Sequence, residues 1–371
     1  MNGWLLVGIG ITLFTSALIL SKEKKKSFDF MLIGWLISNS AYLVYLFLNF
    51  EKWIAPNWGL LVILNFTPLL TAPLLFFYVK TLVSKQTFSI RKNLFHFLPY
   101  LLMTGSALGF NFIADEQAYF SEGVMYHTYQ APYFLRVYGL VMAFFSFLYP
   151  MFCLYLIYKH RVRIKDEFSF QETITLGWLN KWIIAEIVGF WITFLIIWAG
   201  SFQFIDFQTS FSIVGLVLTF NICFVGFFGL KQQVIFTKES SIAPQLKYQK
   251  SSLSPAEIDQ ITTKLNDLMA SEKPFLNAKL DIYTLAEKAS INKHQLSQAI
   301  NFGLSINFYD YVNSYRIGEF KRKVKEENYG HLSLLGIALE SGFNSKSSFN
   351  LVFKKNEGMT PSAFKKSLDK I

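Results

Sequence analysis

Charged residues are scarce in this chain. Only 16% of its 371 residues are Asp, Glu, Lys or Arg, whereas soluble globular domains typically contain about 25%. Hydrophobic residues account for 52% of the sequence and aromatic residues for 18%. This composition excludes an ordinary soluble enzyme, and we expect much of the chain to lie in a lipid bilayer. The net charge of +10 suits anionic partners, but it combines loop lysines with a basic C-terminal region.

Cysteine is nearly absent, and the signatures of enzymes are missing. Cys153 and Cys223 both lie in apolar runs, which excludes a disulfide framework and a cysteine-rich metal site. The five histidines show no HExxH spacing. There is no phosphate-binding loop, no GxSxG elbow and no GxGxxG after a strand-like run. We therefore predict no enzymatic activity, no cofactor and no metal site, so that any signal passes without an enzymatic relay.

Seven apolar runs dominate the first 230 residues. Each is close to the roughly 20 residues needed to cross about 30 Å of hydrocarbon. The first run has no basic segment before it and lysines after it, so we interpret it as a span and not as a signal peptide. The sequence predicts an all-α fold that begins with a seven-helix transmembrane bundle over residues 1–230. The runs lie at about residues 3–20, 28–50, 58–83, 94–113, 133–158, 176–200 and 210–230.

The loops between these runs alternate in charge. Basic residues follow the first, third, fifth and seventh runs, as at 24–26 and 159–165, whereas 114–132 contains three acidic residues and no Lys or Arg. Loops rich in Lys and Arg stay in the cytoplasm. The pattern predicts a multi-pass protein of the inner cell membrane with its N-terminus outside and everything after the seventh run in the cytoplasm.

Polar and helix-breaking residues inside the runs are candidates for a sensing site. Asn65, Thr67, Pro68 and Thr71 cluster in the third run, where prolines free backbone carbonyls that a ligand, a neighbouring helix or water must satisfy. A packed kink is the alternative interpretation. Glu186 is a further candidate because an acid at membrane depth is costly, although a late helix start would place it near the cytoplasmic interface. We predict that these five residues sense an unknown small-molecule or envelope signal.

The composition changes abruptly after the seventh run. Residues 238–253 are polar and contain Pro and Ser, which is typical of a linker. Ser254, Pro255 and Glu257 then form a helix-start signal, and we expect this helix to pack on the following domain or on a second copy of the chain. We predict a linker over 231–254 and a DNA-binding domain with a preceding helix over 255–371.

From residue 281 the sequence is typical of short, well-capped helices. The segments LAEKASINKHQLSQAI and IALESGFNSKSSFNLVF share an Ala, a tight turn, an Asn and a polar helix anchored by Leu296 or Phe349. This repetition predicts two helix-turn-helix units joined by one long helix. The predicted helix starts are Asp281, Asn292, Asn307, Ser333, Ser345 and Thr360.

The block NFYDYVNSYRIGEFKR, followed by IALESGFNSKSSFNLVFKKNEGMTPSAF, resembles the C-terminal domain of the AraC/XylS family of transcription regulators over roughly residues 275–368. The upstream segment, including PLLFFYVKTL, resembles a membrane-bound branch of that family with a multi-span N-terminal region. The resemblance implies that the two recognition helices enter successive major grooves of double-stranded DNA. The connecting helix would fix their separation.

The resemblance also implies base-facing positions. Gln298 would suit adenine and Lys346 guanine, whereas Lys354 and Lys355 are better placed for phosphate. Three positions depart from the family pattern: Leu351, where Arg or another polar residue is common, Gly336, where an acidic residue is usual, and Ser290, where a turn glycine is common. The base-facing positions implied are Lys293, His294, Ser297 and Gln298 in the first recognition helix, and Lys346, Ser347, Ser348 and Leu351 in the second.

These observations together predict a membrane-embedded, one-component transcription regulator with the bundle as sensor. We expect two copies to pair, because one domain alone offers only two short recognition helices. The alternative is a seven-span transporter or channel whose helical tail is regulatory and has lost DNA binding. Leu351 slightly favours that alternative, but the basic recognition helices and the lack of paired broken helices or internal repeats count against it.

Overall fold

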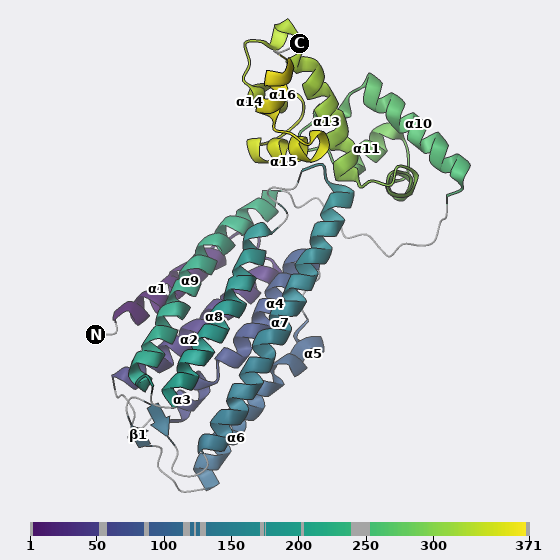
Figure 1. Cartoon of the computed structure of the whole chain (residues 1–371). Coiled ribbons are helices and arrows are strands. Elements are labelled where there is room, and N and C mark those ends of the chain that lie inside the picture. Colours follow the sequence, from purple (N-terminus) through teal and green to yellow (C-terminus); the bar gives the residue numbers. More distant parts are fainter. Residues whose placement is uncertain are drawn as a thin grey trace. The chain divides into compact units, whose positions relative to one another are not determined.

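The computed structural model describes residues 3–51, 58–84, 89–113, 119–121, 124–126, 131–170, 174, 176–201, 204–238 and 253–368 (Figure 1). Contacts divide the chain into two units. The first comprises Met1–Tyr158 with Leu176–Pro244, and the second comprises Lys159–Thr175 with Gln245–Ile371. Residues 239–252 of the linker predicted at 231–254 lie outside the described residues. Helix α9 nevertheless continues to Lys238, past the predicted end of the bundle at 230.

The first unit is helical, as predicted, and each of the seven apolar runs coincides with helix. Five helices of the described residues, α1, α2, α7, α8 and α9, are individually long and apolar enough to cross a membrane. A sixth crossing results if α3 and α4, which meet at a bend of 43°, count as one. Helix α6 has 16 residues and is not among these helices. The helices are α1 Gly3–Leu20, α2 Ser27–Phe50, α3 Trp58–Asn65, α4 Pro68–Ser84, α5 Ile90–Asn93, η1 Leu94–Phe97, α6 Leu98–Ile113, α7 Ala131–Glu167, α8 Gly177–Ser201 and α9 Phe207–Lys238.

The first unit differs in two places from the seven continuous helices and irregular loops that the sequence predicts. The third run is broken, since α3 ends at Asn65 and α4 begins at Pro68. Proline disfavours the helical conformation at the preceding residue and has no N–H to donate, which explains the break. The predicted loop at 114–132 contains a short antiparallel hairpin of β1, Tyr119–Ser121, and β2, Val124–Tyr126.

The interior of the first unit centres on α2, which packs against α1, α4 and α9. Trp35 of α2 meets Trp182 of α8 edge to face, with ring centroids 5.4 Å apart. Close approach of α1 and α9 depends on a small residue, because a Cβ at Gly215 would lie 2.8 Å from Leu5. The outer surface is apolar as well. Large exposed side chains there include Leu13, Phe14, Leu140, Phe144, Phe147, Leu195, Phe220 and Phe227.

The second unit consists of short helices, and each predicted helix start is confirmed by a side-chain cap. Ser254 and Glu257 form a reciprocal capping box at the start of α10. The side chains of Asp281, Asn292, Asn307, Ser333, Ser345 and Thr360 each accept a backbone N–H of the following turn at 2.8–3.2 Å. The elements are α10 Pro255–Ser271, η2 Pro274–Leu276, α11 Ile282–Ala289, α12 Lys293–Gln298, the π-helical turn η3 Ala299–Gly303, α13 Phe308–Val324, η4 Glu327–Tyr329, α14 Leu334–Glu340, α15 Lys346–Glu357 and α16 Pro361–Leu368.

One long helix supplies side chains to two hydrophobic clusters of this unit. Phe308 and Val312 of α13 lie in a cluster with α11 and α12, whereas Ile317 and Phe320 lie in a cluster with α14 and α15. Helix α10 packs on the first cluster through Leu265 and Met269. Of the two expected partners of this helix, the following domain and a second copy of the chain, the structure shows the following domain. The connecting helix therefore fixes the two helix-turn-helix units relative to each other.

Candidate nucleic-acid interface

The first helix-turn-helix unit is formed by α11, a tight turn and α12. Ser290 holds the turn in the left-handed conformation, with φ of +50°. The N–H of Ile291 then donates to the carbonyl of Ala286 at 3.0 Å. Asn292 caps α12 by accepting the N–H of His294 at 2.9 Å. Glycine is common at this position in the family that the sequence resembles, and it adopts this conformation without strain. Ser290 carries a Cβ and is therefore strained there.

The second helix-turn-helix unit, formed by α14 and α15, repeats this turn with a glycine at the position that corresponds to Ser290. Gly342 has φ of +95°, and a Cβ there would collide with the carbonyl of Phe275. The N–H of Phe343 donates to the carbonyl of Ala338 at 3.1 Å, which reproduces the bond between Ile291 and Ala286. The internal repeat expected from the sequence is therefore present in the backbone hydrogen bonds of both units.

Helix α12 presents its predicted base-facing residues unevenly. His294 is exposed and Gln298 is half-buried. Ser297 is buried, with 9% of its surface exposed, and its hydroxyl accepts a long hydrogen bond from Asn301 at 3.4 Å. Lys293 is held by Glu167, with Nζ 3.0 Å from Oε1 of the carboxylate. The predicted residues on this helix therefore range from exposed to buried.

Helix α15 presents a more open surface. Lys346 and Ser347 are exposed, and Ser348 is half-buried where its N–H reaches the Ser345 cap. Leu351 is 71% exposed, so its side chain is available for contact with a thymine methyl. Lys354 is exposed as well.

Lys355, the second predicted phosphate contact, is exposed but forms an ion pair with Asp310 at 2.7 Å. Because its side chain remains 64% exposed, water screens this pair strongly. Lys355 can therefore exchange its carboxylate for a phosphate at little cost.

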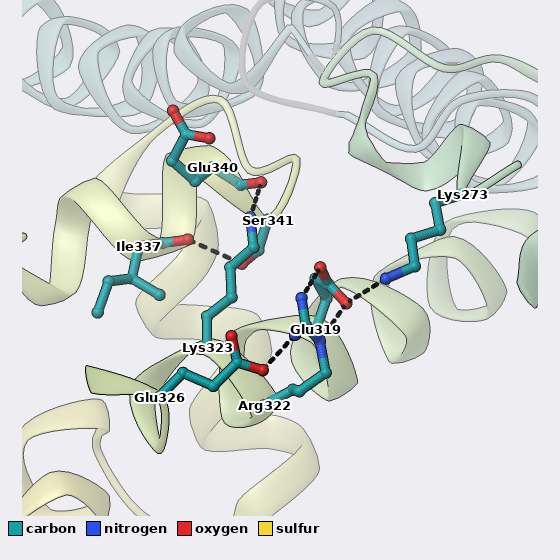
Figure 2. Close-up of polar contacts among 8 residues, drawn as sticks. All are labelled: Lys273, Glu319, Arg322, Lys323, Glu326, Ile337, Glu340 and Ser341. Atoms are coloured by element: carbon teal, nitrogen blue, oxygen red, sulfur yellow. Dashed lines mark hydrogen bonds and ion pairs between the residues drawn. The ribbon is translucent and has the colours of Figure 1, made fainter. Parts of the chain in front are cut away.

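Polar side chains of α13 contact residues both before the first helix-turn-helix unit and within the second (Figure 2). Glu319 accepts from Arg322 at 2.7 Å and from Lys273 at 3.2 Å. These bonds, that from Arg322 first, hold the pKa of Glu319 below its ordinary value. Arg322 also pairs with Glu326, and Lys323 donates to the carbonyl of Glu340 at 2.7 Å. The α13 side chains thus contact both the segment before α11 and the end of α14.

Arg316 is the largest fully buried side chain of this unit and was not among the residues singled out from the sequence. Its guanidinium donates to the carbonyls of Phe275 at 2.8 Å and Asn277 at 2.8 Å, to Asn313 Oδ1 at 3.3 Å, and to two oxygens of Ser169. Burial lowers the pKa of Arg316 to about 10, so it stays charged at neutral pH. A buried charge with its donors satisfied is a specific structural anchor.

Glu167 and Ser169 were also missed, because the sequence around them indicates only a basic loop. They precede the described part of the DNA-binding region by more than eighty residues. No local spacing rule connects them to Lys293 or Arg316. Their contacts arise only when the chain folds back on itself.

The predicted sensing residues lie in the first unit. The carbonyls near the break between α3 and α4 are satisfied by hydroxyls: Ser38 donates to Thr67 at 2.8 Å, Thr67 to Leu64 at 2.7 Å, and Thr71 to Pro68 at 2.7 Å. The carbonyl of Asn65 accepts from Tyr138 at 3.3 Å. Hydrogen bonds within the unit therefore satisfy these four carbonyls.

Glu186 lies nine residues after the start of α8, and its Oε1 is buried without a hydrogen-bond partner among the described residues. Within those same residues, His, Cys, Asp and Glu side chains do not gather in groups of three that would hold a metal ion. The chemically distinctive surface that the structure describes is thus the pair of helix-turn-helix units.

Comparison with known proteins agrees with this geometry. Residues 285–367 match a family model described as a helix-turn-helix domain. The chain is 30% identical over 91 residues to the probable transcription factor PqrA of Proteus vulgaris, and the match covers 24% of this chain and 72% of that protein. No solved structure matches the chain. With two capped helix-turn-helix units joined by a long helix, the chain belongs to the AraC-type family of DNA-binding transcription regulators.

Proposed function

We propose that this protein is a membrane-embedded, one-component transcription regulator. The bundle of residues 1–230 crosses the inner cell membrane with its N-terminus outside, and the domain of residues 255–371 binds promoter DNA in the cytoplasm. The observation that carries the proposal is the combination, in one chain, of a helical unit with an apolar outer surface and a helix-turn-helix unit with polar recognition helices.

The exposed apolar side chains of the first unit support the membrane assignment. Leu13, Phe14, Leu140, Phe144 and Phe220 are each 60–71% exposed. Soluble proteins rarely expose contiguous apolar patches of more than a few hundred Å². Helices of this length with apolar residues on the outside are typical of lipid-facing spans. The match to a transcription factor favours a regulator over the transporter or channel alternative.

Sequence-specific binding is assigned to α12 and α15. Gln298, Lys346 and Ser347 lie on these helices and suit base edges, whereas Lys354 suits phosphate. Two copies of the chain would pair so that their domains bind together, because linked domains gain affinity through effective concentration. Asn65, Thr67, Pro68, Thr71 and Glu186 remain the proposed sensing residues, with Glu186 the stronger of these because one of its oxygens is buried and unpaired.

The proposed DNA contacts are tested by selecting a preferred site from random duplexes with the full chain in lipid nanodiscs. Gln298→Ala and Lys346→Ala should each weaken that site by about 1 to 3 kcal/mol and relax base preference. Lys354→Ala should weaken preferred and scrambled duplexes similarly and reduce the salt slope by about one. Lys264→Ala, an exposed lysine of α10, is the control. Failure of the wild-type chain to enrich any sequence would refute the proposed function.

The proposed topology is tested with single cysteines in a background where Cys153 and Cys223 are replaced by alanine. An impermeant thiol reagent added to intact cells should label a cysteine in 114–132 and leave one in 159–170 unlabelled. After the cells are opened, both should react. The reverse labelling in intact cells would contradict both the orientation and the access of the C-terminal domain to DNA.

A further inference from the structure

The C-terminal end of α7 and the residues that follow it, together the α7 segment, belong to the same contact unit as the DNA-binding domain. Residues Lys159–Thr175 group by their contacts with Gln245–Ile371 and not with the bundle. Phe168 forms an isolated antiparallel bridge with Asp281, directly before α11. Both the N–H and the hydroxyl of Ser169 donate to the carbonyl of Leu280, at 3.2 and 2.6 Å. The segment therefore joins the first helix-turn-helix unit through backbone pairing as well as side chains.

Arg316 anchors this segment from the other side. Its Nη1 donates to the carbonyl of Ser169 at 3.0 Å, and its Nη2 donates to the Ser169 hydroxyl at 2.9 Å. Ser169 is 1% exposed and Arg316 is 2% exposed. If the segment left, the buried guanidinium would lose two of its five hydrogen bonds, at a substantial cost. The segment is thus a built part of the domain although it lies outside residues 285–367, which match the family model.

The docked segment brings a carboxylate to the first recognition helix. Nζ of Lys293 lies 3.0 Å from Glu167 Oε1 and 2.9 Å from the hydroxyl of Tyr283. The side chains of Lys293 and Glu167 are only 13% and 18% exposed, unlike the Lys355 and Asp310 pair, whose lysine is 64% exposed. Burial lowers the pKa of Lys293, but the Tyr283 hydroxyl and the Glu167 carboxylate outweigh it and leave that pKa above its ordinary value.

We propose that Glu167 is a positioning residue that regulates DNA binding through Lys293. In the arrangement observed, the ammonium at the start of α12 is committed to Glu167 and Tyr283 and is withheld from DNA. A phosphate can take it only if the carboxylate gives it up. This inference rests on the proposed function, because it assigns a control element to the same recognition helix.

Chain continuity gives this control element its input. Helix α7 runs without a break in secondary structure from Ala131 to Glu167, and its residues up to Tyr158 belong to the bundle unit. Glu167 is the last residue of that helix. A signal that pulls the end of α7 away from the domain would separate Glu167 from Lys293 without any enzymatic relay.

The test compares Glu167→Gln with Glu272→Gln in the full chain in lipid nanodiscs. Glu272 is the control because it pairs with Lys288 at the same distance of 3.0 Å, and neither residue lies on a recognition helix; this pair is more exposed, at 52% and 45%. The probe is the duplex enriched from random sequences by the wild-type chain. If Glu167→Gln frees Lys293 for one further phosphate contact, the salt slope should steepen by about 0.9, so that a rise from 50 to 200 mM salt costs about threefold more affinity than in wild type.

Two companion variants show that the effect passes through Lys293. In a Lys293→Gln background, Glu167→Gln should change neither affinity nor salt slope. Glu167→Asp, which keeps the charge, should restore a slope closer to that of wild type. A merely structural role for Glu167 would not produce a steeper slope that depends on Lys293.

A second readout does not depend on DNA. Reaction of Lys293 with an amine-acetylating reagent, followed by mass spectrometry, should be several-fold faster in Glu167→Gln than in wild type and unchanged in Glu272→Gln. Equal salt slopes for the two variants, or equal acetylation of Lys293 in them, would overturn the inference. If the wild-type chain enriches no duplex, the proposed function fails instead, and the acetylation result still decides whether Glu167 holds Lys293.

Discussion

Replacing Ser169 with alanine should loosen the junction between the α7 segment and the first helix-turn-helix unit. The substitution deletes the hydroxyl that donates to the Leu280 carbonyl at 2.6 Å and accepts from Arg316 Nη2 at 2.9 Å. It keeps the backbone bonds of residue 169 to Leu280 and Arg316. The experiment therefore removes two buried hydrogen bonds and little else.

The magnitude follows from the kind of bond lost. A hydrogen bond between neutral groups contributes about 0.5 to 1.5 kcal/mol, and one to a charged group about 1.5 to 3 kcal/mol. Because the buried hydroxyl itself no longer has to be desolvated, we take about 2 kcal/mol as the net loss. This corresponds to roughly a 30-fold increase in the equilibrium constant for local opening.

Hydrogen exchange followed by mass spectrometry on the full chain in nanodiscs measures this directly. Peptides that contain the first turn of α11, where the N–H groups of Thr284 and Leu285 bond to Asp281, should exchange about 30-fold faster in Ser169→Ala. The control is Ser367→Ala, which removes an exposed hydroxyl from α16. Exchange at α11 that is the same in both variants would refute the docking of the segment.

Three further predictions concern the stability of the second unit, measured by hydrogen exchange of its peptides in the full chain. Ser290→Gly should stabilise this unit by about 0.5 to 1 kcal/mol, because glycine relieves the strain of the positive φ of +50°. Gly342→Ala should destabilise the unit, because a Cβ has no room there. Equal effects of the two substitutions would contradict the strain at Ser290. Phe349→Ala should cost about 3 to 5 kcal/mol because Phe349 is 2% exposed, and Leu351→Ala, at a 71% exposed position, should cost less than about 0.5 kcal/mol. The pKa of Glu319 is lowered on folding, so its stabilising contribution is fully present above its ordinary pKa of 4.5 and is lost as the pH falls from there through the lower pKa of the folded state. Glu319→Gln should therefore flatten the acid limb of a stability profile. An unchanged limb would show that Glu319 does not contribute.

The sequence alone determined most of the helical organisation of the second unit. Caps are local signals, since the side chain of Asn292 or Ser345 bonds to an N–H two or three residues later. The repeated turn is equally local, because its hydrogen bond joins residues five positions apart, Ile291 to Ala286 and Phe343 to Ala338. The match of residues 285–367 to a helix-turn-helix model confirms the DNA-binding domain inferred from these patterns.

The candidate site was predicted less completely than the fold. A resemblance places residues along a recognition helix, but it does not show how each side chain is packed. Ser297 is buried, and Lys293 is engaged by Glu167, whereas Lys346 and Lys354 are exposed. The difference depends on what lies over the start of α12, which a helical repeat cannot reveal.

Only the tertiary structure decided which distant residues meet. Arg316 and Ser169 are 147 positions apart, and Lys293 and Glu167 are 126 apart. Caps and apolar periodicity reflect interactions within one or two helical turns, so they are legible in the sequence. The docking of the α7 segment depends instead on buried hydrogen-bond donors and acceptors finding partners across the fold. A basic loop in the sequence thereby becomes part of the DNA-binding unit, because Arg316 requires the oxygens of Ser169.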